Sequence, residues 1–337
     1  MGDRKHAVCV LAGDGEVEQE GSVPNTREDL EELSASYGGA LIVMEVGMQS
    51  PWVSRFFKEL GHRVLVANPR KVRAIYQNDR KSDRRDAEML ARLARSDEKL
   101  LSPVEHGSEQ AQRDLLQIKL RDNLVRQRVD VISAVRFTLK SMGIRLRSPK
   151  TTCFARHARR ALEEDHAELL AMIEPSLQVI DSMTAQIREL ERAIERLANE
   201  CYPETAFLQQ IAGVGTITSL TFVLTIGDPL RFERARDAAA YLGLVPKRDQ
   251  SGDTDKQLRI SKAGDAYLRR LLVSAAQYIL GPFGPDCRLK RKGLELAERG
   301  GPRAKKKAVV AVARKLTLLM LALWRDETIY KPLKRAA

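Results

Sequence analysis

Two stretches of helical periodicity in the middle of this 337-residue chain constrain its fold more than any other feature. In the first, over about 109–142, apolar residues recur at helical spacings until the turn residues Gly143 and Pro149. In the second, over about 161–199, they recur every three or four residues, at Ile173, Leu177, Ile180, Thr184, Ile187, Leu190, Ile194 and Leu197. A helix with such a stripe must bury it. We therefore expect a long helical coil, whose second helix, over about 162–200, pairs with a second copy of the chain. The alternative is that it packs against the helix over 109–142 of the same chain.

The first 107 residues alternate strand and helix signals, which is typical of an α/β domain. Two short strands at 7–11 and 17–23 enclose a Gly-Asp-Gly turn and predict a hairpin. The pattern then predicts a helix behind the cap residue Thr26, a buried strand over 41–44 that ends on Glu45, a helix over 52–60, a strand over 63–67, and a helix that begins near Ser82. The predicted order is therefore β-β-α-β-α-β-α.

The region after Pro203 predicts a helical domain. Residues 211–216 have the pattern of a turn between two helices, the second of which runs to about Ile226. A polar loop is expected over 246–260, followed by helices over 265–280 and 304–324. In the turn over 211–216, Gly213 and Gly215 either let backbone amides approach a phosphate or form a plain tight turn. The third glycine of a dinucleotide fingerprint is absent, so a nicotinamide cofactor is not expected.

Basic charge is in excess, with 57 Lys and Arg against 45 Asp and Glu, a formal net charge of +12 and a pI near 9.6. The excess lies in two blocks: residues 113–160 carry 13 basic and 3 acidic side chains, and residues 288–315 carry 11 and 2. Residues 161–200 have the opposite balance, with 10 acidic and 3 basic side chains. Such blocks favour a polyanionic partner, because phosphates bound by lysine and arginine release their counterions.

Two classes of protein do not fit the sequence. The four cysteines are far apart and form no Cys-x-x-Cys pair, so neither a disulfide framework nor a zinc knuckle is expected, and the predicted compartment is the reducing cytoplasm. The most apolar stretch, residues 308–324, is split by Arg314 and Lys315, so we expect no membrane span and no membrane partner.

Three carboxylates are candidates for metal binding. Glu45 ends a buried strand, and the three-residue spacing of Asp83 and Asp86 puts both on one face of the following helix. Hard divalent cations such as Mg²⁺ or Mn²⁺ prefer carboxylate oxygens, and they can stabilise the attacking and leaving oxygens of phosphoryl transfer. The alternative is that Asp83 and Asp86 are acids of a helix N-terminus, which the helix macrodipole favours.

A serine in the polar loop is a second candidate. Ser251 precedes a glycine, which leaves it sterically open to a phosphate. The cations that surround it and could stabilise a pentavalent transition state are Lys247, Arg248, Lys256 and Arg259. Ser251 can also be an ordinary turn residue. Ser261 beside Lys262 is a competing nucleophile, although its position favours a role as a helix cap.

These motifs together resemble the DEDD-type transposases of bacterial insertion sequences, the IS110 family, over nearly the whole chain. The N-terminal resemblance rests on Val43-Met44-Glu45, Asn68-Pro69-Arg70 and Lys81-Ser82-Asp83-Arg84-Arg85-Asp86-Ala87. The C-terminal resemblance rests on Ile211-Ala212-Gly213-Val214-Gly215-Thr216, Tyr241-Leu242-Gly243-Leu244-Val245-Pro246, Gln250-Ser251-Gly252 and Ile260-Ser261-Lys262-Ala263-Gly264. Four ordered motifs in the C-terminal part make the resemblance specific.

The resemblance implies a fold of α+β class: an α/β ribonuclease-H-like catalytic domain over 1–107, a helical coil over 108–202 and an all-α domain over 203–330. It implies that Glu45, Asp83 and Asp86 bind Mg²⁺ or Mn²⁺ and that Ser251 is the nucleophile that links covalently to DNA. The expected partners are DNA, a structured guide RNA and further copies of the chain, as a dimer or tetramer. Expected nucleic-acid contacts are Gly213, Gly215, Lys247, Arg248, Lys256, Arg259 and Lys262.

The sequence departs from the family pattern at one position. The family's first catalytic aspartate lies on the first strand, and the hairpin alignment places it immediately before Met1, while Asp3 falls too late on the strand. We therefore expect the given chain to begin at an internal start codon and to bind metal weakly. Two alternatives follow: a non-catalytic nucleic-acid-binding remnant of a transposase, or a metal-dependent junction nuclease that uses the carboxylates without Ser251.

Overall fold

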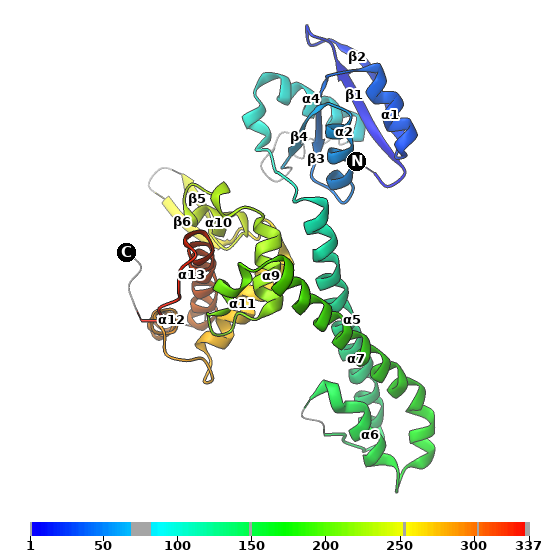
Figure 1. Cartoon of the computed structure of the whole chain (residues 1–337), viewed down its shortest axis with the longest axis vertical. Helices are drawn as coiled ribbons and strands as arrows, with labels where there is room; N and C mark the ends of the chain where they lie inside the picture. Colours follow the sequence, from blue (N-terminus) through cyan, green and yellow to red (C-terminus); the bar gives the residue numbers. More distant parts are fainter. Residues whose placement is uncertain (1, 69–81, 148–149, 252–253, 302, 334–337) are drawn as a thin grey trace. The chain divides into compact units, whose positions relative to one another are not determined.

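The computed structural model describes residues 2–68, 82–147, 150–251, 254–301 and 303–333, and the side chains of these residues except 248–251 and 254–257. The chain forms two compact units, one up to Gly107 and one from Ser108 (Figure 1). Four residues of the motifs quoted above lie outside the described residues: Pro69, Arg70, Lys81 and Gly252. A further division of the second unit at residue 202 stays a prediction.

The first unit contains two small sheets. Strands β1 (Lys5–Leu11) and β2 (Val17–Pro24) form an antiparallel hairpin, and β3 (Leu41–Glu45) pairs in parallel with β4 (Arg63–Ala67). The helices are α1 (Arg27–Ser36), α2 (Ser50–Glu59), α4 (Asp83–Ser96) and the short 3-10 helix η1 (Glu98–Leu101). The predicted order of strands and helices is confirmed over the described residues. In that part of the chain the four strands do not join into one sheet.

Local signals explain where these helices begin. The Thr26 hydroxyl accepts the Asp29 N–H at 3.2 Å, and the Ser82 hydroxyl accepts the Arg85 N–H at 3.3 Å. Each hydroxyl thereby satisfies one of the backbone donors that a helix N-terminus leaves unpaired. Both helix starts were predicted from the sequence.

Helices cover both faces of the β3–β4 sheet. Met44, Val64 and Val66 pack with the buried residues Leu30, Val53, Phe56 and Phe57 of α1 and α2. The alternate residues Val43, Leu65 and Ala67 pack instead with Leu90 and Ala94 of α4 and with Leu101. Because successive side chains of a strand point to opposite faces, α4 lies on one side of this sheet and α1 with α2 on the other.

The second unit begins with the predicted coil. Helix α5 (Glu109–Ser141) packs along α7 (Ala167–Cys201), and the stripe residues Leu177, Ile180, Ile187 and Ile194 are each at most 2% exposed. Within the described residues these four side chains are thus buried by the same chain. The expectation that they pair with a second copy is wrong, and the alternative of packing within the chain is confirmed for them. The predicted start of α7 near residue 161 is wrong: a separate helix, α6 (Phe154–Leu162), precedes it. Phe154 and Leu162 bury the apolar face of α6 against α5 and α7. To pack in this way, α6 must run in a different direction from α7, so the two are separate helices.

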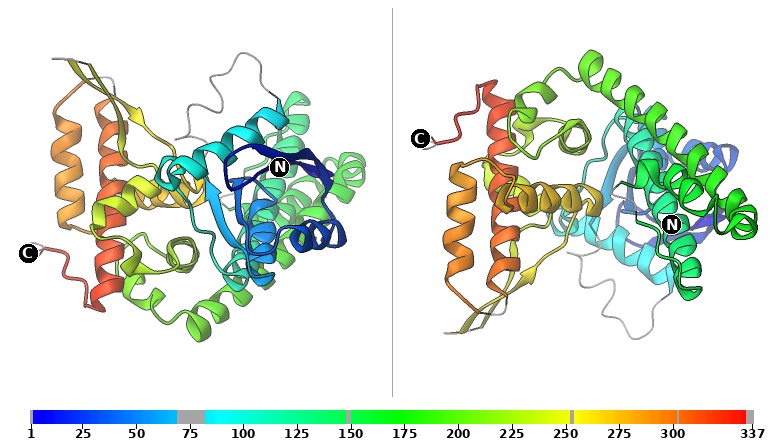
Figure 2. Two further views of the ribbon diagram at one scale, coloured as in Figure 1. Left: turned by 90° about the horizontal axis from the view of Figure 1, so that it is seen from above. Right: turned by 90° about the horizontal axis from the view of Figure 1, so that it is seen from below.

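The rest of the second unit is a helical core. Its helices are α8 (Thr205–Gln209), α9 (Thr216–Ile226), the 3-10 helix η3 (Pro229–Arg231), α10 (Ala235–Tyr241), α11 (Ala266–Leu280), α12 (Arg288–Glu298) and α13 (Ala304–Asp326). Phe222 and Trp324 meet edge to face inside this core, with 6.4 Å between ring centroids. Helices α12 and α13 lie side by side (Figure 2). Among the described helices none is long and apolar enough to cross a membrane.

The expectation of an all-α C-terminal domain with a polar loop over 246–260 is wrong. This segment forms an antiparallel hairpin of β5 (Pro246–Ser251) and β6 (Thr254–Ile260). Its strands escaped prediction because only Leu258 and Ile260 are large apolar residues, so the sequence shows almost no alternation. Backbone pairing forms the hairpin without an apolar face of its own.

Candidate functional site

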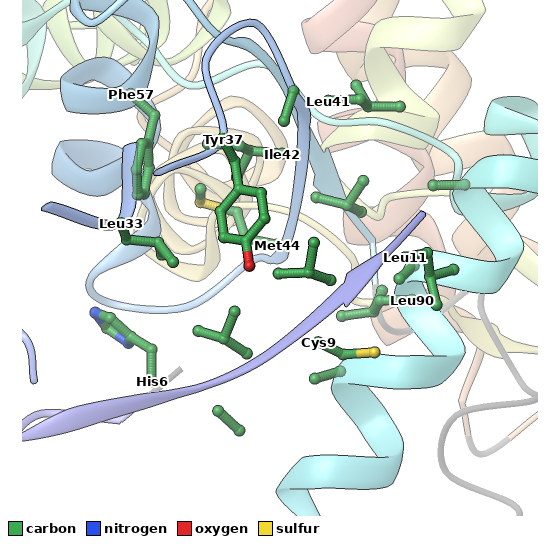
Figure 3. A pocket seen from close by; sticks show the side chains of 18 of the residues that line it. His6, Cys9, Leu11, Leu33, Tyr37, Leu41, Ile42, Met44, Phe57 and Leu90 are labelled. Carbon is green, nitrogen blue, oxygen red and sulfur yellow. The ribbon is translucent and has the colours of Figure 1, made fainter. Parts of the chain in front are cut away.

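A pocket of about 670 Å³ opens in the first unit. Its lining comes from β1, α1, β3 and α4, and Figure 3 shows side chains from these elements turned toward one space. The three carboxylates predicted to bind metal, Glu45, Asp83 and Asp86, all belong to this lining. The fold therefore brings residues that are some forty positions apart in the sequence to the wall of one cavity.

The positions of the three carboxylates follow from local structure. Glu45 is the last residue of β3, opposite Ala67 of β4, and its side chain is half-buried. Asp83 is exposed at the first position of α4, and Asp86 is half-buried one turn later. Over the described residues, no three His, Cys, Asp or Glu side chains lie close enough together to hold a metal ion. The carboxylates thus share a pocket and are not gathered into a closed cluster.

Three arginines attach α4 to the β1–β2 hairpin and so fix the position of Asp86. Arg92 donates to the Gly15 carbonyl at 3.2 Å, Arg95 donates to the Gly13 carbonyl at 2.6 Å, and Arg84 pairs with Glu20. The hydrogen bond to Glu20 raises the pKa of Arg84 above its usual value. These contacts leave the acidic first turn of α4 at the pocket wall, where the macrodipole also favours it.

Sequence reasoning did not identify two further polar residues of the pocket, His6 and Cys9. His6 bonds to the Asn25 side chain at 2.8 Å, and burial lowers the pKa of its imidazole. Burial also raises the pKa of the Cys9 thiol. Both groups are therefore favoured in their neutral forms. The β1 hairpin was predicted, but the edge that it turns toward β3 has no signal in the sequence.

In the second unit, packing explains why residue 213, one of the two glycines predicted to contact phosphate, is a glycine. Gly213 has φ +91°, and a Cβ there would lie 2.8 Å from the Tyr278 ring and 3.2 Å from the Ala275 carbonyl oxygen. This close approach to α11 supports the tight-turn interpretation of Gly213. Gly215 is exposed at the N-cap of α9, with no atom within 4 Å of a Cβ placed there. Phosphate binding at Gly215 stays a prediction.

Two of the C-terminal motifs meet backbone to backbone at the base of the β5–β6 hairpin. The Lys262 N–H donates to the Gly243 carbonyl at 3.1 Å, and the Ser261 N–H donates to the Val245 carbonyl at 2.8 Å. A Cβ on Gly243 would lie 2.2 Å from the Ala263 backbone nitrogen, and one on Gly264 would lie 2.1 Å from the Tyr241 carbonyl oxygen. Only glycine fits at both positions, so these motifs join the hairpin to the helical core.

Ser251 is the last residue of β5, where its backbone pairs with Thr254. The side chains of Ser251, Arg248 and Lys256 lie outside the described part of the chain. Lys247 and Arg259 are exposed on the same hairpin, and Lys262 is exposed at its base. Ser261 is not a helix cap as expected, because Asp265 caps α11 by accepting the Leu268 N–H at 2.8 Å.

Exposed cations gather at the start of α13. Arg303, Lys305, Lys306 and Lys307 are exposed there, whereas several cations of α12 are paired with acids, for example Arg291 with Asp286 and Lys292 with Glu295. Within the described residues no ion pair involves those four cations. Their charge is therefore available to a partner.

Comparison with known proteins gives consistent results over the chain. The family model DEDD_Tnp_IS110, described as Transposase, matches residues 1–144, and the model of the Transposase IS116/IS110/IS902 family matches residues 205–288. Together they cover about two thirds of the sequence.

Two curated relatives are similar over most of their length, and a third is similar over less than half of it. A probable family 20 transposase of Pseudomonas aeruginosa is 29% identical over 301 residues, which cover 87% of this chain and 86% of the relative. The transposase for insertion sequence element IS1111A of Coxiella burnetii is 28% identical over 307 residues, 87% of this chain and 79% of the relative. A pilin gene-inverting protein of Moraxella lacunata is 31% identical over 145 residues, 42% and 44% of the two chains. Since family models of IS110-type transposases match residues 1–144 and 205–288, this chain belongs to the IS110 family of insertion-sequence transposases, which are DNA recombination enzymes.

Proposed function

We propose that this transposase cuts and rejoins DNA strands with Ser251 as nucleophile and with Glu45, Asp83 and Asp86 as ligands of Mg²⁺ or Mn²⁺. The proposal includes a ribonuclease-H-like arrangement of the first unit, guidance by a structured RNA of the same element, and action as a dimer or tetramer. The observation that carries it is the meeting of the three predicted carboxylates at one pocket, in a chain whose family acts on DNA.

The donor set fits a hard divalent cation. Glu45, Asp83 and Asp86 offer carboxylate oxygens, the ligands that Mg²⁺ and Mn²⁺ prefer, from a strand end and one helical turn. When bound, such an ion supplies charge stabilisation for the oxygens of a phosphoryl transfer. Asp83 is exposed, so its carboxylate is open to water and to a phosphate, while Glu45 and Asp86 are half-buried. With three carboxylates that are not closely clustered, we expect weak affinity.

Ser251 would perform a transesterification. Its Oγ forms a bond to a DNA phosphorus, the bond from that phosphorus to the leaving strand oxygen breaks, and the hydroxyl proton passes to that oxygen. The product is a phosphoserine ester that conserves the energy needed to rejoin the ends. Lys247 and Arg259, both exposed on the same hairpin, are suited to neutralise the phosphate charge as the pentavalent transition state forms.

The basic surfaces are suited to hold nucleic acid. The first basic block lies on α5 and α6, and the second lies on α12 and α13 with the exposed cations at 303–307. Contacts of this kind position a phosphate backbone without reading its sequence. They favour both DNA and a folded RNA as partners.

The test is to trap the covalent protein–DNA adduct. The chain is expressed together with the DNA element that encodes it, the complex is denatured and digested with nuclease, and the modified peptide is found by mass spectrometry. We expect a nucleotide on Ser251, its loss in Ser251→Ala and its retention in Ser261→Ala. An adduct that survives Ser251→Ala but not Ser261→Ala would refute the nucleophile.

Two other outcomes of the test favour the alternatives. Strand cleavage without any adduct would favour a metal-dependent junction nuclease, and DNA binding without cleavage would favour a non-catalytic remnant.

A further inference from the structure

The β5–β6 hairpin is joined to the helical core at its base. Of the hairpin side chains that the structure describes, Ile260 at the base packs against the core, and the others are exposed. Ser251 ends β5, which begins at Pro246. At roughly 3.3 Å for each residue step, β5 is about 17 Å long between these two residues. The direction in which the hairpin leaves its base therefore decides where Ser251 lies.

A small rotation at the base causes a large displacement at the far end of a strand. Over about 17 Å, a rotation of only about 3° displaces the end by about 1 Å. Reacting atoms must approach within about 3–3.5 Å, and a misplacement of about 1 Å can slow a reaction about hundredfold. Attack by a serine on this hairpin therefore requires a base that is held firmly.

One side chain of α11 links the segments that enter and leave the hairpin. The Nη1 atom of Arg269 donates to the Leu242 carbonyl at 3.0 Å and to the Ala263 carbonyl at 2.6 Å. Leu242 is the C-cap of α10, shortly before β5, and Ala263 follows shortly after β6. A single guanidinium thus ties both sides of the hairpin base to α11.

The position of this guanidinium suits a charged donor. Leu242 is buried, and its carbonyl lies at the C-terminus of α10, where carbonyl groups lack partners within the helix. The macrodipole favours a cation there, and a charged donor makes stronger hydrogen bonds than a neutral one. Because Gly243 and Gly264 let the two segments approach closely, one nitrogen atom reaches both carbonyls.

The backbone between these bonds is strained. Lys262, next to Ala263, has φ +54°, in the left-handed region that a non-glycine residue enters at a cost. Such a conformation persists only where the surrounding structure holds it. The Lys262 N–H is held by the Gly243 carbonyl at 3.1 Å, and the following peptide is held by Arg269 through the Ala263 carbonyl.

We propose that Arg269 is a positioning residue for strand transfer: it fixes the direction of the β5–β6 hairpin, and with it the place of Ser251, without contacting DNA itself. This inference rests on the proposed function, because it takes Ser251 as the nucleophile. The side chain of Arg269 is half-buried and directed to carbonyls of its own chain, which supports a role inside the protein.

Hydrogen exchange of the full chain tests whether Arg269 holds the base. In Arg269→Met, which removes both hydrogen bonds, the amides of Ser261 and Lys262 should exchange at least about tenfold faster, because their own bonds close the base. The matched control is Arg270→Met, which removes a guanidinium from the next position, where it pairs with Asp122 of α5 at 2.7 Å. Exchange of the two amides should not change in this control.

The yield of the covalent adduct over time tests whether the positioning serves the reaction. We expect Arg269→Met to form the adduct about hundredfold more slowly than the unmodified chain, because the serine hydroxyl is displaced from the phosphorus. Its Kd for the element's DNA should stay within about twofold, because no phosphate contact is lost. Arg270→Met should match the unmodified chain in both measurements, and Arg269→Lys, which can still reach one carbonyl, should recover part of the rate.

Four results would overturn or separate the proposals. A normal adduct rate in Arg269→Met, or unchanged exchange of Ser261 and Lys262, would overturn the positioning role. So would weaker DNA binding in Arg269→Met that Arg269→Lys restores completely, because this result indicates a phosphate contact. If Arg269→Met does not fold, Arg269→Lys is compared instead, with slower adduct formation and faster exchange than the unmodified chain as the expected result. A missing Ser251 adduct in the unmodified chain would refute the proposed function itself, and is thereby distinguished from a defect confined to the Arg269 variants.

Discussion

Replacing Gly243 by alanine should release the β5–β6 hairpin from the helical core. At φ +68° an alanine costs roughly 1–2 kcal/mol, because its Cβ crowds the neighbouring carbonyl oxygen. The Cβ would also lie 2.2 Å from the Ala263 nitrogen and 2.4 Å from the Ala263 carbonyl oxygen, so the backbone at Ala263 must move. Forced overpacking of this kind typically adds about 1–3 kcal/mol. We therefore expect Gly243→Ala to destabilise the second unit by about 2–5 kcal/mol.

The matched control is Gly143→Ala, which isolates the backbone strain. Gly143 has φ +85° and lies in the same unit, but a Cβ there would meet no atom within 4 Å. Its cost should be only about 1–2 kcal/mol. Urea unfolding is followed by the fluorescence of Trp324, in a Trp52→Phe background that removes the other tryptophan. Equal losses of stability in the two variants would refute the close approach at Gly243.

Three further predictions concern metal, nucleic acid and pH. Titration calorimetry with Mn²⁺ should show weak binding to the unmodified chain and to Glu59→Ala, and less binding to Asp86→Ala; identical heats from Asp86→Ala would remove it from the site. Replacing Lys305, Lys306 and Lys307 together by glutamine should weaken binding to unrelated DNA sequences alike and lower the salt slope by about 0.9 for each phosphate that is no longer neutralised; an unchanged slope would place the phosphate contacts elsewhere. Burial lowers the pKa of His6 and His106, so the folded first unit binds fewer protons than the unfolded chain, and its stability should fall as the pH drops below the ordinary histidine value of 6.5. His106→Gln should reduce that loss in acid unfolding experiments, and equal acid sensitivity would contradict the prediction.

The parts of the fold that the sequence predicts are those set by local signals. The first hairpin, the buried strands and the helices after Thr26 and Ser82 follow from apolar runs and cap residues that act within a few positions. The C-terminal hairpin lacks such a signal, since its polar strands are paired through the backbone. The separate helix α6 was missed because the packing of Phe154 against the coil depends on a distant segment.

In the candidate site, too, the features with local sequence signals could be predicted, whereas contacts between distant segments could not. A carboxylate at a strand end and two on one helical turn could be read from the sequence, and the fold places all three at one pocket. Contacts between distant parts of the chain could not be predicted from the sequence: the place of His6 and Cys9 in the pocket, and the close approach of Gly243 to Ala263. Chain topology decides these contacts, and no short window of sequence contains it.

The central claim is that the pocket carboxylates and Ser251 serve one reaction. Its most direct test measures the yield of the protein–DNA adduct in Glu45→Gln, which keeps the shape of the side chain and removes its charge, alongside the control Glu59→Gln at the exposed end of α2. We predict that Glu45→Gln loses the adduct while it retains DNA binding, and that Glu59→Gln forms it as the unmodified chain does. A normal adduct yield from Glu45→Gln would contradict the account.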